Sequence, residues 1–270
     1  MLGADEQLTT GPVEVVAEGF QFTEGPVWMP GEGWLFSDIP ADTIFRADKS
    51  VFRKPSGKSN GLVLDGEDRL IACEHWNRRV TRTEKDGSIT VLAAACDGKR
   101  LNSPNDATVR SDGAVFFTDP QYGLEGREAD LEIAGVYMIA PSGEVRLLID
   151  DFKKPNGIHL SLDEKTLYVA DTEGSHIRAF DVAEDGSLSK GRVFCELPGP
   201  DGMDLDALGR VWCTSGAGVE VFSATGERLG VVECPQAPAN CAFGGEDGIT
   251  LYMTARTGVY KVQCAVAGAK

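Results

Sequence analysis

The feature that most constrains the fold of this chain is a short motif that occurs six times. Each copy is an apolar run rich in β-branched and aromatic residues, followed by a small or polar residue and then an acid or its substitute. The copies are GWLFSD, RLIACE, AVFFTD, TLYVAD, RVWCTS and TLYMTA, which end at Asp38, Glu74, Asp119, Asp171, Ser215 and Ala255. Repeats spaced by roughly 36 to 52 residues are typical of propellers and solenoids, and runs of this composition favour strands.

Each repeat also contains the other pieces of a four-stranded sheet. In the third repeat, NDATVRSDG leads into AVFFTD, then into GVYMIAPSG and EVRLLID. SDG and PSG are turn sequences that join consecutive antiparallel strands. No convincing amphipathic helix interrupts this pattern. We therefore predict an all-β, six-bladed β-propeller with four antiparallel strands per blade, an arrangement that leaves only short strand edges exposed.

The strand count predicts how the ring closes. The last repeat is one strand short, whereas VEVVA at residues 13–17 is one strand too many ahead of the first repeat. We expect residues 13–17 to complete the last sheet, so that residues 1–270 form a single propeller domain. The expected blades are residues 22–57, 58–96, 101–151, 154–197, 199–234 and 237–264.

Composition excludes several classes of partner. The formal net charge of −16 disfavours nucleic acid and anionic membrane surfaces. The first 12 residues lack the pattern of a secretory signal, and no apolar run approaches the 18 residues of a membrane-spanning helix. The seven cysteines are scattered, with no C-x-x-C pair, which favours reduced thiols and a cytoplasmic location. Nothing in the sequence argues for or against a dimer.

Six polar residues precede the first strands of the six repeats. A single Asn-Gly pair such as Asn156–Gly157 is typical of a turn, but the first strand of every blade lines the channel of a propeller. Six oxygen-bearing side chains in equivalent positions therefore indicate a site at the channel. They are Glu24, Asn60, Asn105, Asn156, Asp201 and Asn240.

Two of these six residues, Glu24 and Asp201, are carboxylates. Carboxylates that face a narrow channel repel one another and lose solvation unless a cation or protons compensate. Oxygen-only ligands with two negative charges suit a hard divalent ion such as Ca²⁺, Mg²⁺ or Mn²⁺. A His-ligated zinc site has little support, because His75, His159 and His176 show no H-x-x-x-H spacing.

Several longer motifs together resemble a known family. They are EGPVW, CEHWNRRVTR, LNSPNDATVRSDGAVFFTDPQYG, KPNGIHLSLDEKTLYVADT and PDGMDLDALGRVW. The sequence resembles the gluconolactonase and regucalcin family of metal-dependent six-bladed propellers, also called the senescence-marker-protein family, and its bacterial gluconolactonase branch in particular. The match runs over nearly the whole chain.

The resemblance implies a divalent cation held by Glu24, Asn156 and Asp201. Ca²⁺ is the first expectation, with Mg²⁺, Mn²⁺, Zn²⁺ and Fe²⁺ as alternatives. It also implies that Asn105 is a further ligand or a substrate contact, and that Asp201 is the candidate general base. Asn60 and Asn240 are left as residues that line the channel.

One position departs from the family. In the animal regucalcin branch, an Arg two residues before the equivalent of Asn105 helps to bind substrate. Here that position is Ser103, and the next basic residue upstream is Arg100. Sugar recognition need not therefore follow the animal enzymes.

The expected function is a hydrolase that opens sugar lactones to aldonic acids. A cation polarises the carbonyl, and the attacking water is activated either by Asp201 or by the ion itself. We expect Glu74, His75 and Tyr122 to reach the substrate, with residues 119–135 as a lid. Tyr122 and Trp76 have the alternative of packing against their own loops.

Two other functions stay open at this point. The same ion could serve the hydrolysis of phosphotriesters, or it could be structural in a propeller that only binds partners. A comparison of the turnover of lactones with the turnover of organophosphates would distinguish the phosphotriesterase from the lactonase. Two weaker motif matches are set aside: GKSNG around Ser59 lacks the following helix of a nucleophile elbow, and DLDALG at 204–209 lacks the later ligands of a calcium loop.

Overall fold

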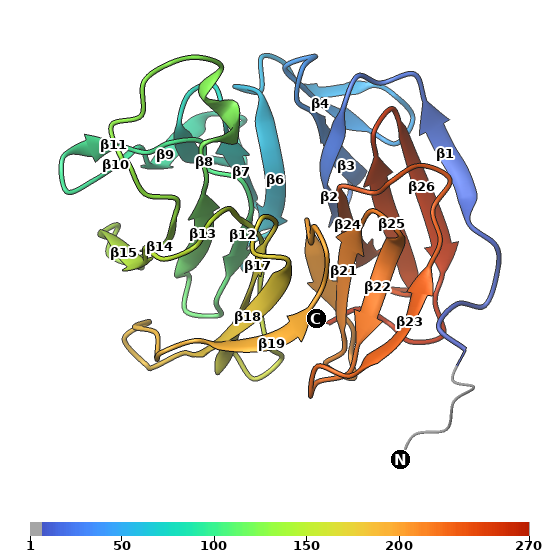
Figure 1. Ribbon diagram of the computed structural model, residues 1–270. Coiled ribbons are helices and arrows are strands. Elements are labelled where there is room, and N and C mark those ends of the chain that lie inside the picture. The colour runs from blue at the N-terminus through green and yellow to red at the C-terminus, as the bar shows by residue number, and fades with distance from the viewer. Residues whose placement is uncertain (1–6, 270) are drawn as a thin grey trace.

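Six four-stranded antiparallel sheets surround a central channel in the computed structural model, which describes residues 7–269 (Figure 1). The predicted all-β, six-bladed propeller is confirmed. Within the described residues, the one helix is the short 3₁₀ turn η1 (Tyr122–Leu124), and no helix there is long and apolar enough to cross a membrane. Part of the stretch in which no secretory signal was recognised, residues 1–6, lies outside the described residues.

The blades follow one another along the chain, and each begins with its innermost strand. The first two are β2 (Thr23–Met29), β3 (Gly33–Asp38), β4 (Thr43–Arg46) and β5 (Val51–Arg53), then β6 (Ser59–Leu64), β7 (Leu70–Glu74), β8 (Arg79–Thr83) and β9 (Ile89–Ala93). The third and fourth are β12 (Ala107–Val109), β13 (Val115–Asp119), β14 (Gly135–Ile139) and β15 (Val145–Ile149), then β16 (Pro155–Leu160), β17 (Thr166–Asp171), β18 (His176–Asp181) and β19 (Arg192–Glu196). The fifth is β20 (Met203–Leu205), β21 (Val211–Ser215), β22 (Gly218–Phe222) and β23 (Arg228–Val232), and the sixth contains β24 (Asn240–Gly244), β25 (Thr250–Ala255) and β26 (Gly258–Gln263). A small hairpin, β10 (Ala95–Cys96) and β11 (Lys99–Arg100), lies between the second and third blades.

The ring closes as predicted. Strand β1 (Glu14–Glu18) pairs antiparallel with β26, so that Glu14 lies opposite Lys261 and Glu18 opposite Gly258. In Figure 1 the blue strand β1 accordingly lies beside the red strand β26. The N-terminal strand therefore supplies the outermost strand of the last blade.

Apolar layers fill the spaces between neighbouring blades. The layer between the second and third blades, for example, joins Ile71 and Cys73 to Phe117 and Tyr137, whose rings stack at 5.4 Å. Six such layers occur among the described residues, one between each pair of adjacent sheets. The second strand of each blade is buried on both faces, which explains why the recurring motif is a continuous apolar run rather than an alternating one.

The acid that ends the recurring motif is structural in three blades. Asp38 accepts hydrogen bonds from the backbone N–H of Phe22 at 3.1 Å, and Asp171 accepts one from Lys154 at 2.9 Å. Asp119 accepts one from Asn102 at 2.7 Å. Each carboxylate thus holds the segment that leads into the first strand of its own blade. The repeat recognised in the sequence therefore positions the channel residues without belonging to the site.

Candidate functional site

The six polar residues predicted to ring the channel do lie at equivalent places. Glu24, Asn60 and Asn156 are the second residues of the innermost strands β2, β6 and β16, and Asn240 is the first residue of β24. Asn105 and Asp201 lie two residues ahead of β12 and β20. Five of the six side chains belong to buried residues, and Asp201 is half-buried. The structure therefore brings together residues that lie more than 200 positions apart in the chain.

Close contact between adjacent blades explains the glycines that follow several of these residues. Gly157 N–H donates to the carbonyl of Asp201 in the next blade at 3.0 Å, and Gly61 N–H donates to that of Asn105 at 2.7 Å. A Cβ atom on Gly157 would lie 2.3 Å from the Asp201 carbonyl oxygen, which is too close for any side chain. Asn156–Gly157 thus lies inside strand β16 and is not a turn, because glycine is needed there for space.

Hydroxyl groups from the second strands fix the same ring. Ser37 Oγ donates to the carbonyl of Asn60 at 2.8 Å, and Thr118 Oγ1 donates to that of Asn156, also at 2.8 Å. Both donors sit one residue before the acid of the recurring motif. Since each bond crosses from one blade to the next, the ring residues are held by their neighbours as well as by their own strands.

Charge repulsion is the main electrostatic feature of this ring. Burial raises the pKa of Glu24 well above its usual range, and the charges of Asp201 and Asp106 raise it further. Burial also raises the pKa of Asp201 to about 7, again with a contribution from Asp106. Carboxylates in this state bind a proton or a cation more readily than isolated ones.

Asp106 is a member of this group that sequence reasoning missed. It is buried, it accepts hydrogen bonds from Asn240 Nδ2 at 3.2 Å and from the Ala107 N–H at 3.0 Å, and burial raises its pKa to about 7. The signal was present in SPNDATV, where an acid stands in the place that glycine takes after Asn60 and Asn156. Three acids, not two, therefore contribute to the field at the ring.

The donor set fits a hard divalent cation only with the help of amides. Among residues 7–269, no group of three or more His, Cys, Asp or Glu side chains is arranged to hold a metal ion. The predicted ligands Glu24 and Asp201 supply two carboxylates, and Asn156 and Asn105 supply neutral oxygens, a mixture that Ca²⁺ accepts. In addition, the buried Oδ1 of Asn60 has no hydrogen-bond partner within the described part of the chain. These observations make the ring suitable for a cation, while the role of each ligand stays a prediction.

Tyr122 lies at the edge of this ring. Asn156 Nδ2 donates to Thr172 Oγ1 at 3.1 Å, which leaves the Asn156 oxygen free to bind a ligand. Tyr122 is 40% exposed. The pKa of its phenol is raised, mainly by burial and further by the charge of Asp201, against the opposing effect of hydrogen bonding to Thr172 and Asn156. Lys154 Nζ lies 4.3 Å from the centre of the Tyr122 ring. Tyr122 thus lies close to Asn156 and Asp201, and its contact with a substrate stays a prediction.

Glu74 makes a different set of contacts from those predicted. Its side chain is fully buried and accepts hydrogen bonds from Arg79 Nε at 2.7 Å, from Asn77 Nδ2 at 2.6 Å and from Thr81 Oγ1 at 2.8 Å. Arg53 forms a second ion pair with it. A carboxylate engaged in this way stabilises the second blade, and substrate contact by Glu74 stays a prediction without structural support.

His75 lies beneath the 3₁₀ turn η1. A Cβ atom on Gly123 would lie 2.5 Å from the Cβ of His75, so the turn rests directly on the imidazole. His75 Nε2 lies 3.3 Å from Asn60 Nδ2, and burial lowers the pKa of His75 to about 4. The neutral ring therefore connects the predicted lid to a channel residue, and direct binding of substrate by His75 stays a prediction.

The predicted lid is tied to the body of the propeller. Ser103 is buried, its hydroxyl donates to the carbonyl of Pro120 at 2.5 Å, and it accepts from the Gly123 N–H at 2.9 Å. The guanidinium of Arg127 lies 4.2 Å from the centre of the Trp76 ring and donates to the carbonyl of Trp76 at 2.7 Å. The position that holds an Arg in the animal branch is therefore used here to anchor the loop.

A second residue that sequence reasoning missed is Arg256, in the turn between β25 and β26. Its carbonyl accepts a hydrogen bond from the N–H of Thr23 at 2.8 Å, next to Glu24. Its exposed guanidinium lies 5.3 Å from the centre of the Phe22 ring, and its charge lowers the pKa of Asp201 against the larger effects of burial and Asp106. Nothing within the sixth repeat marks this residue, because its contacts come from the first blade.

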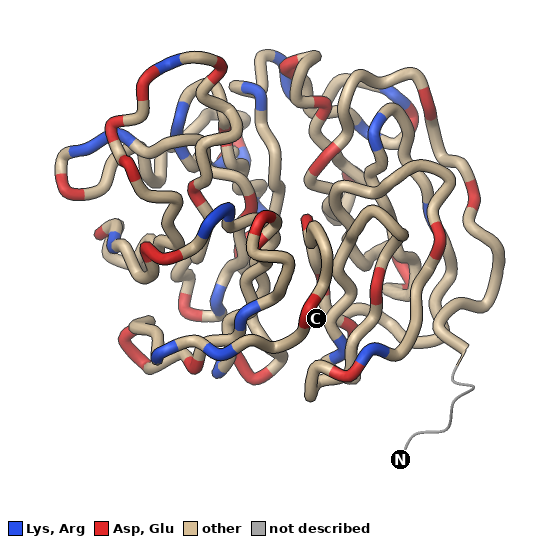
Figure 2. Tube along the Cα trace, viewed as in Figure 1, with Lys and Arg blue, Asp and Glu red and all other residues tan. Residues whose placement is uncertain are grey.

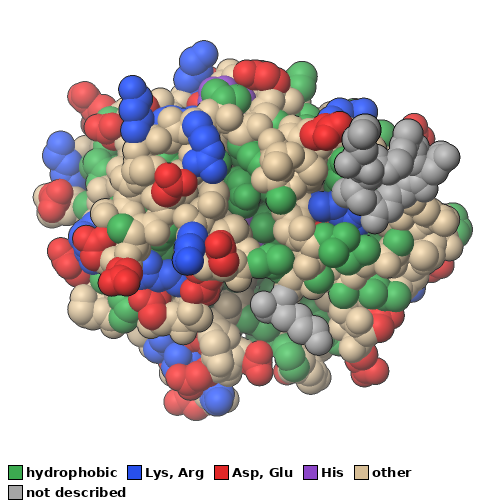
Figure 3. Space-filling model, turned by 90° about the horizontal axis from the view of Figure 1, so that it is seen from below, with side chains coloured by type: hydrophobic (Ala, Val, Ile, Leu, Met, Phe, Trp, Pro, Cys, Tyr) green, Lys and Arg blue, Asp and Glu red, His purple; other side chains and the backbone are tan. Residues whose placement is uncertain are grey.

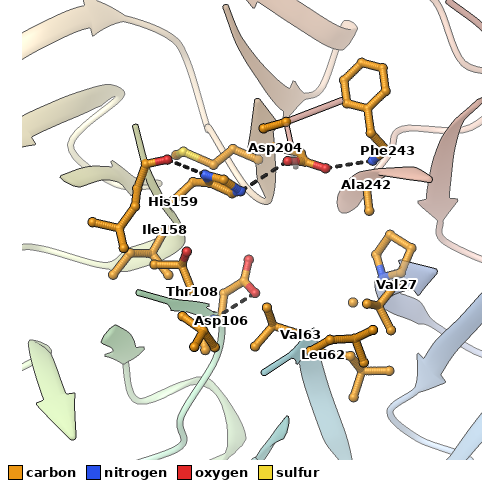
Figure 4. Close-up of a pocket in the computed structure, with 18 of the residues that line it drawn as sticks. Val27, Leu62, Val63, Asp106, Thr108, Ile158, His159, Asp204, Ala242 and Phe243 are labelled. Carbon is orange, nitrogen blue, oxygen red and sulfur yellow. Dashed lines mark hydrogen bonds and ion pairs between the residues drawn. The ribbon is translucent and has the colours of Figure 1, made fainter. Parts of the chain in front are cut away.

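The channel continues on the other side of the ring as a cavity of about 510 Å³. In Figure 4 the walls are formed by side chains of the innermost strands, and His159 lies opposite Val27. His159 Nε2 lies 3.2 Å from Asp204 Oδ1, and the other Asp204 oxygen accepts from the Phe243 N–H at 2.7 Å. Asp106 lines this cavity as well, whereas Glu24, Asn156 and Asp201 do not. Figure 3, seen from below, shows apolar side chains gathered at the centre of this face.

Comparisons with known proteins agree with this architecture. The profile of the SMP-30/gluconolactonase/LRE-like region matches residues 22–257. A gluconolactonase from Zymomonas mobilis is 32% identical, over 95% of this chain and 82% of that protein. The structure of a gluconolactonase from Xanthomonas campestris superposes with a TM-score of 0.87 at 33% identity, over 96% of this chain and 95% of the other.

A more distant structure shares the fold. A regucalcin from Agrobacterium tumefaciens, described as a calcium-binding protein, superposes with a TM-score of 0.78 at 22% identity, over 97% of this chain and 95% of the other. The family profile spans most of the chain, and the Zymomonas protein is similar over nearly all of it. The resemblance seen in the sequence is therefore confirmed, and the chain belongs to the SMP-30/gluconolactonase/LRE-like family.

Proposed function

We propose that this protein is a lactonase that opens sugar lactones of the gluconolactone type to aldonic acids with the help of one divalent cation. The observation that carries the proposal is a pair of carboxylates, the buried Glu24 and the half-buried Asp201, whose charges repel each other at one end of the channel beside the amides Asn105 and Asn156. The gluconolactonases of similar sequence and structure support the reaction class.

Glu24, Asn156 and Asp201 would hold the cation, with Asn105 as a fourth ligand or a substrate contact. The regucalcin described as calcium-binding supports Ca²⁺ as the first ion to test. When bound, a divalent cation supplies Lewis acidity toward the lactone carbonyl and makes water more acidic. It would also remove the repulsion that raises the pKa of both carboxylates.

The side chains of this protein would guide the proton and orient the substrate. Asp201 would take a proton from the attacking water as the water oxygen bonds to the carbonyl carbon. The ring C–O bond then breaks, and Asp201 returns the proton to the leaving ring oxygen, which becomes a hydroxyl. Tyr122, half-exposed beside Asn156, would pack its ring against the sugar.

The test is acid release from D-glucono-1,5-lactone and a set of aldono-1,4-lactones, corrected for spontaneous opening. Chelator-treated protein is compared with protein to which Ca²⁺, Mg²⁺, Mn²⁺, Zn²⁺ or Fe²⁺ is restored. We expect hydrolysis that requires the ion and falls at least 1000-fold in Asp201→Asn, on the order of other losses of a catalytic group. Asp112→Asn is a matched control, because that acid pairs with Arg110 in the turn between β12 and β13, at the other end of these strands from Asn105.

Two other outcomes of the same assay would favour a different function. Turnover of a phosphotriester in place of any lactone would keep the ion and change the substrate. Metal binding that raises stability without turnover of either ester would refute the lactonase proposal and favour a structural ion in a binding propeller.

A further inference from the structure

Arg256 is a cation at the ring that forms no ion pair with any other residue that the structure describes. Among residues 7–269, no hydrogen bond or ion pair engages its guanidinium, although the chain holds 42 Asp and Glu against 26 Lys and Arg. Figure 2 shows Asp and Glu spread along most of the chain in this view, with Lys and Arg among them. By contrast, Lys58 is paired with Glu125 at 2.6 Å and Lys154 with Glu173 at 3.0 Å. An unpaired, exposed guanidinium in such an acidic protein is available to a ligand.

The position of Arg256 is fixed by the first blade. The N–H of Thr23, directly before Glu24, donates to the carbonyl of Arg256 at 2.8 Å, while the Thr23 hydroxyl donates to the Gly258 carbonyl at 2.9 Å and lies 3.4 Å from that of Arg256. The Phe22 ring lies under the guanidinium, which limits the freedom of a long side chain. Arg256 also holds a φ of 51°, which is uncommon for a residue with a side chain.

The turn between β21 and β22 in the fifth blade corresponds to the turn of Arg256, between β25 and β26 in the sixth. Ser215 pairs with Gly218 there as Ala255 pairs with Gly258 in the sixth blade, so Gly216 takes the place of Arg256. Gly216 does not have a positive φ, whereas the sixth blade carries a bulky cation with a φ of 51° at the corresponding position. In the closed ring the sixth blade lies between the first blade, which carries Glu24, and the fifth, which carries Asp201. Arg256 therefore belongs to the blade that adjoins both carboxylate-bearing blades.

Charge balance indicates what Arg256 would bind. A divalent cation would neutralise Glu24 and Asp201, and Asp106 faces the cavity on the far side of the ring, where Asn240 donates to it. The positive charge of Arg256 would then remain for the substrate. A guanidinium presents a planar fork of donors that matches a carboxylate or a phosphate. The net charge of −16 would otherwise repel an anionic substrate.

We propose that Arg256 is a specificity-determining residue that selects lactones with an anionic substituent, a carboxylate or a phosphate, away from the reacting carbonyl. This inference rests on the proposed lactonase function. Ser103, which anchors its own loop, leaves the position of the animal-branch Arg without a cation, and Arg256 supplies one from the opposite side of the ring.

The experiment compares three lactones on metal-loaded protein. They are the neutral D-glucono-1,5-lactone, D-glucaro-1,4-lactone with its carboxylate, and the 6-phosphate of D-glucono-1,5-lactone. The variants are Arg256→Gln, Arg256→Lys and, as a matched loss of a positive charge that is ion-paired in the second blade, Lys58→Gln. Circular dichroism and thermal unfolding check that each variant is folded.

We expect wild type to prefer at least one anionic lactone, and the responding substituent identifies carboxylate or phosphate. Arg256→Gln should lower kcat/KM for that lactone about 10- to 100-fold, mainly through KM, as expected for loss of a charged hydrogen bond. The neutral lactone should change by less than about threefold. Arg256→Lys should retain part of the preference because it keeps the charge, and Lys58→Gln should retain all of it.

The two proposals fail in different ways. Turnover of the three lactones with the same anionic-to-neutral ratio in wild type and Arg256→Gln would refute the role of Arg256 alone. A wild-type preference for the neutral lactone would do the same. Absence of turnover on every lactone would refute the lactonase function and this inference with it.

Discussion

Replacing Asp201 with Asn should have opposite effects on the stability of the metal-free protein and on its activity. An ordinary Asp has a pKa near 3.9, whereas burial and the charge of Asp106 raise the pKa of Asp201 to about 7. The folded state therefore binds this proton more tightly than the unfolded state does. The resulting stability is present below about pH 4 and is lost as the pH rises from about 4 to about 7.

The size of the effect follows from that difference. At about 1.4 kcal/mol per pH unit, keeping Asp201 ionised at pH 8 costs the fold up to about 4 kcal/mol. Asp201→Asn keeps the shape of the side chain and removes this cost. We expect the metal-free variant to be more stable than wild type by up to about 4 kcal/mol at pH 8 and nearly equal to it at pH 4.

The assay is urea unfolding of chelator-treated protein at several pH values, repeated with a divalent cation. Wild type should gain about 2.7 kcal/mol when the ion is present at 100 times its Kd, whereas the variant should gain little and hydrolyse lactone at least about 1000-fold more slowly. The reasoning is refuted if Asp201→Asn destabilises the metal-free protein at pH 8, or if its advantage does not grow between pH 4 and pH 8.

Three further predictions concern the framework of the ring. Gly157→Ala should destabilise the protein by more than about 2 kcal/mol in thermal or urea unfolding, because the new Cβ would meet the Asp201 carbonyl at 2.3 Å; an unchanged midpoint would contradict the close contact of these blades. Glu74→Gln should cost roughly 3 to 5 kcal/mol of stability, because it removes the charge that pairs with Arg53 and Arg79. A raised KM without loss of stability would instead support substrate contact by Glu74. Asp171→Asn should lose about 1 to 3 kcal/mol of stability in urea unfolding, because its carboxylate accepts three backbone N–H groups; an unchanged midpoint would show that these bonds do not hold the segment before β16.

Much of the fold could be read from the repeats because each blade is a local unit. Its four strands follow one another in sequence, so turn residues and apolar runs predict them directly. The closing strand was also predictable, since counting strands showed a surplus at one end and a deficit at the other; the observed β1, Glu14–Glu18, lies one residue beyond the expected 13–17.

The positions of the ring residues were predictable for the same reason. Each stands at the start of the first strand of its own repeat, and the symmetry of the propeller brings equivalent positions together. What no single repeat contains is the partner from another blade. Asn240 donates to Asp106 across 134 positions, and Thr23 holds Arg256 across 233.

The sequence by itself thus determined the number of blades, the closure of the ring and the six polar positions around the channel, because these depend on patterns within 40 to 50 residues or so. Only the tertiary structure decided that Glu74 is held in ion pairs, that Asp106 joins the acids of the ring, and that Arg256 lies over Phe22 with no ion pair in the described part of the chain. Burial, repulsion and unpaired charge are properties of neighbours in space. In a closed ring those neighbours come from other blades, where no local pattern records them.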